Sequence, residues 1–211
     1  MRVVVATEDF KDFRQADLDR HLDAMSRFAE RARGSSGPSL CCTMILRSAA
    51  SAPAQTLILM KDELMSAGVR VRAIFAKLEP EDDLRRLFAC LSDLAPDMPA
   101  AELIGWARNP RLLDAHEQVT YGGDMCWSGD AMRRDAGKRN PLVLFDMDAP
   151  EVAQRSQFAF KALWGASVHV PEHHLTAGVT AKPCAAYEQA PDDAPITALR
   201  PNIQGWPLVR H

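Results

Sequence analysis

The residues of this chain best suited to chemistry lie between positions 103 and 145. His116 opens a predicted strand, and the Gln118 side chain falls on the same face because side chains alternate along a strand. A Gly122-Gly123 turn leads into a second predicted strand, which ends in Trp127-Ser128-Gly129-Asp130. Histidine titrates near neutral pH, so His116 either contacts an anion or is a strand histidine satisfied by hydrogen bonds. The residue types alone leave both interpretations open.

A basic cluster follows this second strand and consists of Arg133, Arg134, Lys138 and Arg139. Arginine suits bidentate contact with phosphate, so the cluster could bind an anion or, weakly, nucleic acid. In the alternative interpretation, Asp130 forms local ion pairs with Arg133 and Arg134, and the Lys138-Arg139 pair faces solvent.

This arrangement resembles the phospholipase D superfamily, in particular its single-motif members. The family signature is His-x-Lys, four residues, Asp, and then Gly-Ser-x-Asn shortly after an aromatic residue. His116-Glu117-Gln118 stands at the first segment and Trp127 to Met132 at the last. Residues 64–72 resemble the helix-to-strand step of the family, and residues 158–164 its closing helix. The resemblance spans about residues 40 to 168.

The resemblance implies a mixed α/β fold and a metal-independent phosphodiesterase or nuclease that forms a phosphohistidine on His116. A homodimer would bring a second histidine to the site, and Gln118 would stand at the lysine position. No cofactor and no metal are expected. The residues that the resemblance and the basic cluster assign to phosphate are Ser128, Gly129, Asp130, Arg133, Arg134, Lys138 and Arg139.

The chain departs from the family pattern at four positions. Gln118 replaces the lysine, and the loss of one such transition-state contact costs on the order of 2.7–4 kcal/mol. Gly123 stands at the aspartate position, with Asp124 one residue late. Asp130 at the serine position adds a negative charge that repels phosphate, and Met132 replaces the asparagine.

Three hypotheses follow from these residues. In the first, a degenerate, non-catalytic phospholipase D-like domain serves as a binding or assembly module, a homodimer through the former catalytic face with anion or weak nucleic-acid affinity. In the second, a phosphodiesterase uses His116 at a homodimer interface, with an arginine in place of the lysine. In the third, a metal-dependent enzyme uses Asp124 and Asp130 with histidines.

Two further groups of residues have competing interpretations. His169, His173 and His174 beside Glu172 could bind zinc, but Pro171 argues against a helix there, and solvated loop histidines are predicted instead. Cys126 lies on a strand that is predicted to be buried, where a thiol is inert.

Periodicity predicts helices over residues 10–33, 54–67, 150–165 and the stretch that opens with Glu79 and Glu81. Strands are predicted over residues 3–6, 41–46, 69–75, 102–106, 117–121, 125–127 and 142–145. Early strands that alternate with helices indicate parallel pairing, and the later cluster of strands indicates antiparallel hairpins. The predicted fold is α/β, a mixed β-sheet flanked by helices on both faces.

Composition places the chain among ordinary globular proteins, with 211 residues, 47% hydrophobic and 25% charged, and a net charge of −3. This slightly negative net charge argues against a protein that binds nucleic acid over most of its surface. No apolar run approaches the about 18 residues of a membrane span, and the first residues lack a secretory signal. Five cysteines without a paired spacing favour free thiols and a cytoplasmic protein. One domain is predicted over residues 1–170, with a proline-rich extension over 171–211.

Overall fold

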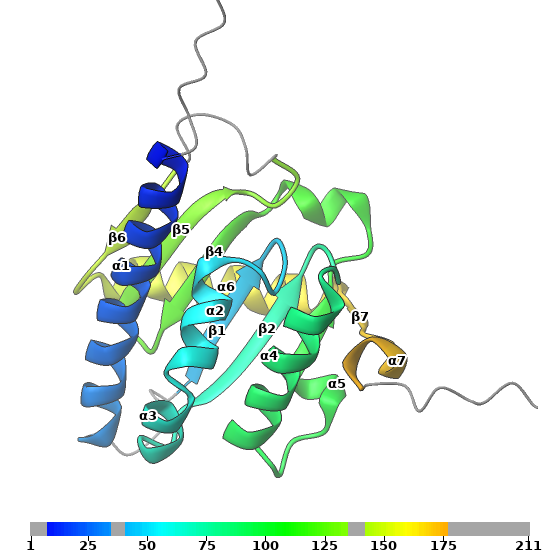
Figure 1. The fold of residues 1–211 in the computed structure, drawn as a ribbon, viewed down its shortest axis with the longest axis horizontal. Helices are drawn as coiled ribbons and strands as arrows, with labels where there is room; N and C mark the ends of the chain where they lie inside the picture. Colours follow the sequence, from blue (N-terminus) through cyan, green and yellow to red (C-terminus); the bar gives the residue numbers. More distant parts are fainter. Residues whose placement is uncertain (1–7, 35–40, 135–141, 177–211) are drawn as a thin grey trace, which may run out of the picture. The chain divides into compact units, whose positions relative to one another are not determined.

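Seven strands form one mixed sheet in the order β6-β5-β4-β1-β2-β3-β7 (Figure 1). The computed structural model describes residues 8–34, 41–134 and 142–176. The predicted strand at residues 3–6, the Lys138-Arg139 pair and most of the predicted extension lie outside the described residues.

The strands are β1 (Cys41–Leu46), β2 (Arg70–Phe75), β3 (Ile104–Trp106), β4 (His116–Tyr121), β5 (Met125–Ala131), β6 (Leu144–Asp146) and β7 (Val168–His169). The α-helices are α1 (Glu8–Arg33), α2 (Ala52–Leu59), α3 (Lys61–Ser66), α4 (Glu81–Leu94), α5 (Ala100–Leu103), α6 (Pro150–Ala166) and α7 (Glu172–Leu175), and a short 3-10 helix, η2, covers Pro110–Asp114.

The predicted mixture of parallel and antiparallel strands is confirmed. β1, β2 and β3 run parallel, because helices cross over between them. β4, β5 and β6 pair antiparallel, with β4 beside β1, and β7 pairs antiparallel with β3. The sheet therefore changes from parallel to antiparallel between β1 and β4.

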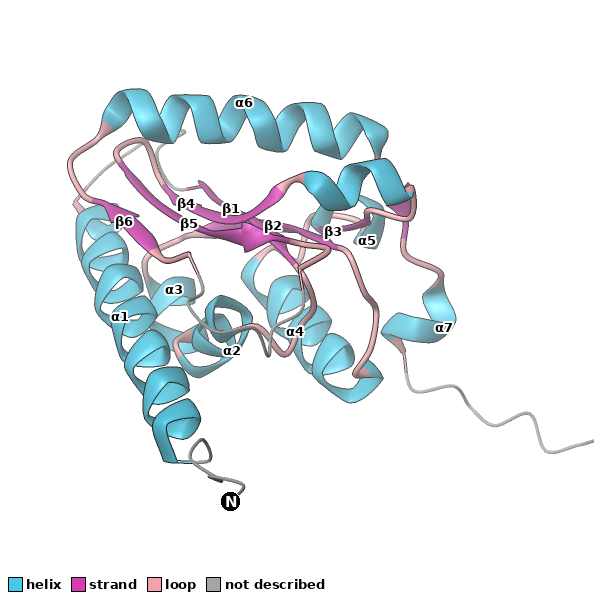
Figure 2. Cartoon of the chain, turned by 90° about the horizontal axis from the view of Figure 1, so that it is seen from above, coloured by secondary structure: helices cyan, strands magenta, loops and turns pink. Residues whose placement is uncertain are grey.

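Helices cover both faces of the sheet, as predicted (Figure 2). α6 packs on one face against β1, β4 and β5, over a small core that contains Ile45, Ile74 and Phe160. α1, α2, α3 and α4 cover the other face and enclose the larger core, which includes Met44 and Leu57. This is an α/β fold with a mixed sheet between two helical layers.

Several predicted boundaries were wrong. The single helix expected over residues 54–67 is two helices that meet at Met60, and α5 occupies the start of the strand expected at residue 102. β5 continues four residues beyond the predicted strand end at Trp127, to Ala131. No helix spans His169 to His173, as the proline at 171 predicted, but residues 172–175 are a short helix, α7, and not the predicted loop. Pro171 immediately precedes the first turn of this helix, where no backbone N–H is required.

The residues after β7 pack against helix α4. Leu175 is buried, and His174 Nδ1 lies 3.1 Å from Glu81 Oε1 at the start of α4. Within the described ranges, no helix has both the length and the apolar character that crossing a membrane requires.

Helix α1 is joined to the sheet through a buried histidine. His21 is fully buried, and its Nδ1 lies 2.8 Å from the hydroxyl of Tyr121 on β4. Its ring packs edge-on against Trp127 on β5, with ring centroids 4.7 Å apart. Burial lowers the pKa of His21 to about 3, so the folded protein holds this imidazole neutral at physiological pH.

The buried His21 predicts acid-sensitive stability. The unfolded chain protonates His21 below its ordinary pKa of 6.5, whereas the folded chain does not until about 3. The unfolded state therefore binds more protons in this window. As a result, the free energy of unfolding decreases as the pH is lowered, by at most about 1.4 kcal/mol per pH unit.

Urea unfolding between pH 7 and 5 measures this slope, with His21→Gln as the matched variant that cannot titrate. Burial raises the pKa of Asp17, so the titration of this carboxyl changes the free energy of unfolding in the direction opposite to that of His21. Wild type and variant both contain Asp17, so both include this contribution. Equal slopes in wild type and variant would contradict the assignment.

Candidate functional site

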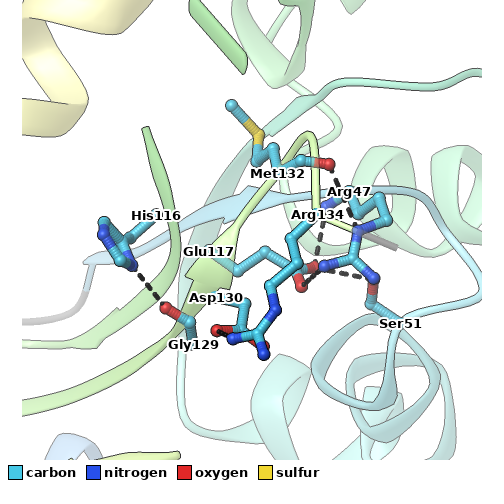
Figure 3. A network of polar contacts seen from close by, with 8 residues as sticks. All are labelled: Arg47, Ser51, His116, Glu117, Gly129, Asp130, Met132 and Arg134. Carbon is cyan, nitrogen blue, oxygen red and sulfur yellow. Dashed lines mark hydrogen bonds and ion pairs between the residues drawn. The ribbon is translucent and has the colours of Figure 1, made fainter. Parts of the chain in front are cut away.

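The predicted site residues gather where β1 ends, β4 begins and β5 ends. The pairing of Ile45 with Gln118 brings the end of β1 beside the start of β4. His116 pairs with Ala131, so the end of β5 lies on the other side of the same strand. Figure 3 shows that Arg47, Ser51, Glu117 and Met132 are joined by contacts at this edge of the sheet, with Asp130 bound to Arg134 beside them. His116 lies apart from these residues and contacts Gly129.

A buried ion pair between Glu117 and Arg47 lies at the centre of this edge (Figure 3). The two side chains are only 10% and 15% exposed, and Arg47 Nη2 lies 3.0 Å from Glu117 Oε2. Glu117 Oε1 also accepts hydrogen bonds from the Arg47 backbone N–H, at 2.9 Å, and from the Ser51 hydroxyl, at 3.1 Å. Arg47 Nε donates to the backbone carbonyl of Met132, at 3.2 Å. The pair therefore joins β1, the start of α2, β4 and the end of β5.

Neither Glu117 nor Arg47 was among the predicted site residues. One signal was present in the sequence. Glu117, Val119 and Tyr121 are alternate residues of one strand and therefore share a face, and Val119 and Tyr121 face the core. A charged residue in such an alternation indicates a buried charge that requires a partner. The partner is 70 residues away in the sequence, so the pattern cannot identify it.

His116 is exposed at the start of β4, and its Nδ1 lies 2.8 Å from the backbone oxygen of Gly129. Because a carbonyl oxygen only accepts hydrogen bonds, Nδ1 carries the proton, and Nε2 of the neutral ring keeps its lone pair. The pairing of β4 with β5 shifts register between His116 and Gln118, which forms a β-bulge at this point. His116 is thus hydrogen-bonded to the neighbouring strand through Nδ1, and this bond does not use Nε2.

Gln118 is bound to the layer on the other side of the sheet. Its amide donates a hydrogen bond to the hydroxyl of Ser156 on α6. The same hydroxyl lies 3.0 Å from the buried Cys126 thiol, which is 4.0 Å from the Ser128 hydroxyl. Gln118 therefore connects β4 to α6 through its uncharged amide.

The acidic and basic residues after β5 form ion pairs with one another and with η2. Asp130 pairs with Arg134 at 2.5 Å, as the local interpretation predicted. Arg133, however, pairs with Asp114 of η2 at 2.8 Å rather than with Asp130. Lys138 and Arg139 lie outside the described residues.

Gly129 allows the buried pair and Trp127 to pack together. A Cβ at position 129 would lie 2.7 Å from Trp127 Cη2 and 3.3 Å from Glu117 Cβ. Gly129 is therefore required by packing at this strand end.

The residues of the metal hypotheses are engaged in other contacts. Asp124 pairs with Arg31 of α1, and His174 pairs with Glu81. His173 packs against the ring of His174, with centroids 4.2 Å apart. Among the residues that the structure describes, no three histidine, cysteine or acidic side chains are grouped so as to hold a metal ion.

Comparison with known proteins gives little similarity in sequence. No protein-family model matches the chain, and no curated protein matches it. Among solved structures, the chain is similar to a phospholipase D family member, Nuc, from Salmonella typhimurium, at 13% identity. The match covers 68% of this chain and 88% of that chain, with a TM-score of 0.40.

Removal of the Glu117 carboxylate is predicted to destabilise the fold strongly. Glu117→Ala leaves the Arg47 guanidinium buried without its counterion, and breaking a buried pair in this way costs about 3–5 kcal/mol. Glu102→Ala is the matched control, because its ion pair with Arg72 lies on the surface and is worth about 1 kcal/mol or less. Urea unfolding measures both, and a similar loss in the two variants would refute a special role for the buried pair.

Gly129→Ala is predicted to cost about 1–3 kcal/mol, because Trp127 must shift to accommodate the methyl group. Gly123→Ala serves as its control, since a Cβ there meets nothing within 4 Å. Thermal unfolding of the two variants checks this, and equal melting temperatures would contradict the packing argument.

Proposed function

We propose that the chain is a phospholipase D-like domain that does not hydrolyse phosphodiesters and acts as a binding or assembly module. The observation that carries this proposal is that arginines at the His116 edge are bound to carboxylates of the chain itself. Arg47 binds Glu117, Arg133 binds Asp114 and Arg134 binds Asp130. A phosphate group bound by Arg133 or Arg134 would have to compete with Asp114 and Asp130 for these cations.

Phosphoryl transfer needs the opposite electrostatic arrangement. Negative charge is spread over the phosphoryl oxygens in the transition state, and catalysis depends on cations and N–H donors placed to meet it. Here Gln118 is neutral, and its amide is hydrogen-bonded to Ser156. Asp130 adds a negative charge at the position where the family has serine. These features support loss of hydrolysis with retention of the fold.

A phosphodiesterase that uses His116 is the second candidate, and one observation favours it. The Nδ1–H of His116 is held by the Gly129 carbonyl, so the Nε2 lone pair of an exposed ring is available to attack. In that mechanism Nε2 would form a bond to phosphorus while the bond to the alcohol oxygen breaks. The His116 of a second copy would protonate the leaving oxygen, and water would then release the phosphate from His116.

As a module, the chain would bind a second copy of itself and, weakly, anions or nucleic acid through Arg133, Arg134, Lys138 and Arg139. We assign the module to residues 1–170, with 171–211 as its extension. The described cysteines, Cys41, Cys42, Cys90 and Cys126, are free thiols, which supports a cytoplasmic location.

Hydrolysis of bis-p-nitrophenyl phosphate in the presence of a chelator separates the two candidates. The proposal predicts that wild type releases p-nitrophenol no faster than His116→Ala does, because the arginines that the structure describes at this edge are already paired with carboxylates. Metal-free turnover in wild type that is abolished in His116→Ala would establish the phosphodiesterase instead.

A further inference from the structure

Three exposed cations beyond the ends of β2 and β3 take no part in the ion pairs that occupy the His116 edge. Lys77 follows the end of β2 by two residues, Arg108 follows the end of β3 by two residues, and Arg111 lies in η2. Among the described residues, no carboxylate lies within ion-pair distance of any of them. Their charge is therefore available to a ligand from outside the chain.

The sheet places Lys77 and Arg108 at the ends of adjacent strands. β2 and β3 run parallel, with Phe75 paired to Trp106, and each cation follows this pair by two residues. Adjacent strands are about 4.8 Å apart, so two long side chains that leave them at the same level can reach one anion or two neighbouring ones. The ends of parallel strands are also where open α/β sheets commonly bind ligands.

Arg108 and Arg111 belong to a segment that crosses this side of the sheet. β1 and β2 lie between β3 and β4, so the connection from β3 to β4, residues 107–115, passes the ends of both strands. Leu112 and Leu113 of η2 pack against the small core under α6 and fix the segment there. The three cations therefore follow the ends of several strands instead of surrounding one point.

Arg108 contacts an aromatic ring instead of a carboxylate. Its guanidinium carbon lies 5.5 Å from the centroid of the Trp106 ring. The indole N–H of Trp106 donates to the Ala76 carbonyl, at 3.3 Å, which fixes the ring. A cation–π contact orients the guanidinium without placing an acceptor on its N–H groups. These donors are the groups with which arginine binds the oxygens of a phosphate.

We propose that the phosphate backbone of a nucleic-acid strand binds along residues 107–115, through contacts with Lys77, Arg108 and Arg111. Phosphate is the favoured anion, because contacts of lysine and arginine with phosphates supply most of the non-specific affinity for nucleic acid. A strand with repeated phosphates is favoured over a single phosphate, because the three cations belong to two strand ends and to η2. All three lie outside the basic cluster of residues 133–139 and outside the segments that carry the family resemblance.

Glu79 limits the affinity of this site. It is exposed, and it follows Lys77 by two residues, so its carboxylate lies well within the screening length of about 10 Å at 0.1 M salt. Its charge repels a phosphate and offsets part of the charge of Lys77. Binding is therefore expected to be weak and sensitive to salt, and removal of this one charge should strengthen it.

This site rests on the binding role proposed above and names residues and a ligand for it. The two proposals fail on different measurements. Phosphodiester turnover would overturn the loss of hydrolysis, whereas the salt dependence of binding tests the contacts with Lys77, Arg108 and Arg111.

Fluorescence anisotropy of the full chain with a labelled oligothymidine of about ten nucleotides tests the site. Wild type is expected to bind at low salt, with an affinity that falls as the salt concentration rises. The test variant carries Lys77→Gln, Arg108→Gln and Arg111→Gln together. Each phosphate contact with a single strand contributes about 0.7 to the slope of log affinity against log salt, so this variant should flatten the slope by about 2. It should also bind at least about ten-fold more weakly at low salt.

Lys161→Gln is the matched control, because Lys161 is an exposed cation on α6 without an ion pair among the described residues, and its variant should bind like wild type. Glu79→Gln is expected to bind more tightly than wild type. Thermal unfolding of each variant confirms that it is folded.

A wild-type chain that does not bind the oligonucleotide at low salt would overturn the proposal, as would a folded triple variant with the wild-type slope. Loss of binding on replacement of Lys138 and Arg139 by glutamine, with the triple variant unaffected, would assign the binding to the basic cluster instead. Equal affinity for a thymidine dinucleotide would reduce the site to a single phosphate and overturn the extended contact.

Discussion

The arrangement of the His116 edge depends on the buried pair between Glu117 and Arg47. The Glu117 carboxylate accepts hydrogen bonds from a backbone N–H and a hydroxyl and pairs with a guanidinium, so its charge is compensated by groups of the chain itself. The same guanidinium reaches the Met132 carbonyl and fixes the turn after β5. Because one carboxylate connects β1, the start of α2 and β4, the edge that carries the candidate site is also a structural junction.

This junction has a direct consequence for function. The end of parallel strands beside a change of strand direction is where α/β sheets commonly bind ligands, and anions are favoured at the start of a helix. Here the anion at the start of α2 is Glu117, a residue of the chain itself. Together with the pairing of Arg134 to Asp130, this internal anion means that two of the arginines described at this edge are bound to carboxylates of the chain itself.

Local patterns in the sequence predicted much of the fold, and long-range contacts account for what they missed. The apolar run at 41–46 and the alternation at 69–75 identified β1 and β2, because each pattern is contained within its own strand. His116 and Asp130 were found through motif spacing, and the Asp130–Arg134 pair through proximity. By contrast, Glu117 with Arg47, and Gln118 with Ser156, are partners separated by 70 and 38 residues. Only the folded sheet brings them together, and no local pattern encodes that.

The most direct test of the central claim is a search for a covalent phosphohistidine. Wild type and His116→Ala would be incubated with a phosphodiester, quenched in alkali and analysed by intact-mass spectrometry. If phosphoryl transfer is lost because the arginines described at this edge are bound to internal carboxylates, no phosphorylated protein accumulates in either sample. A phosphorylated wild-type chain, with the modification absent from His116→Ala, would show that phosphoryl transfer survives and would contradict the account.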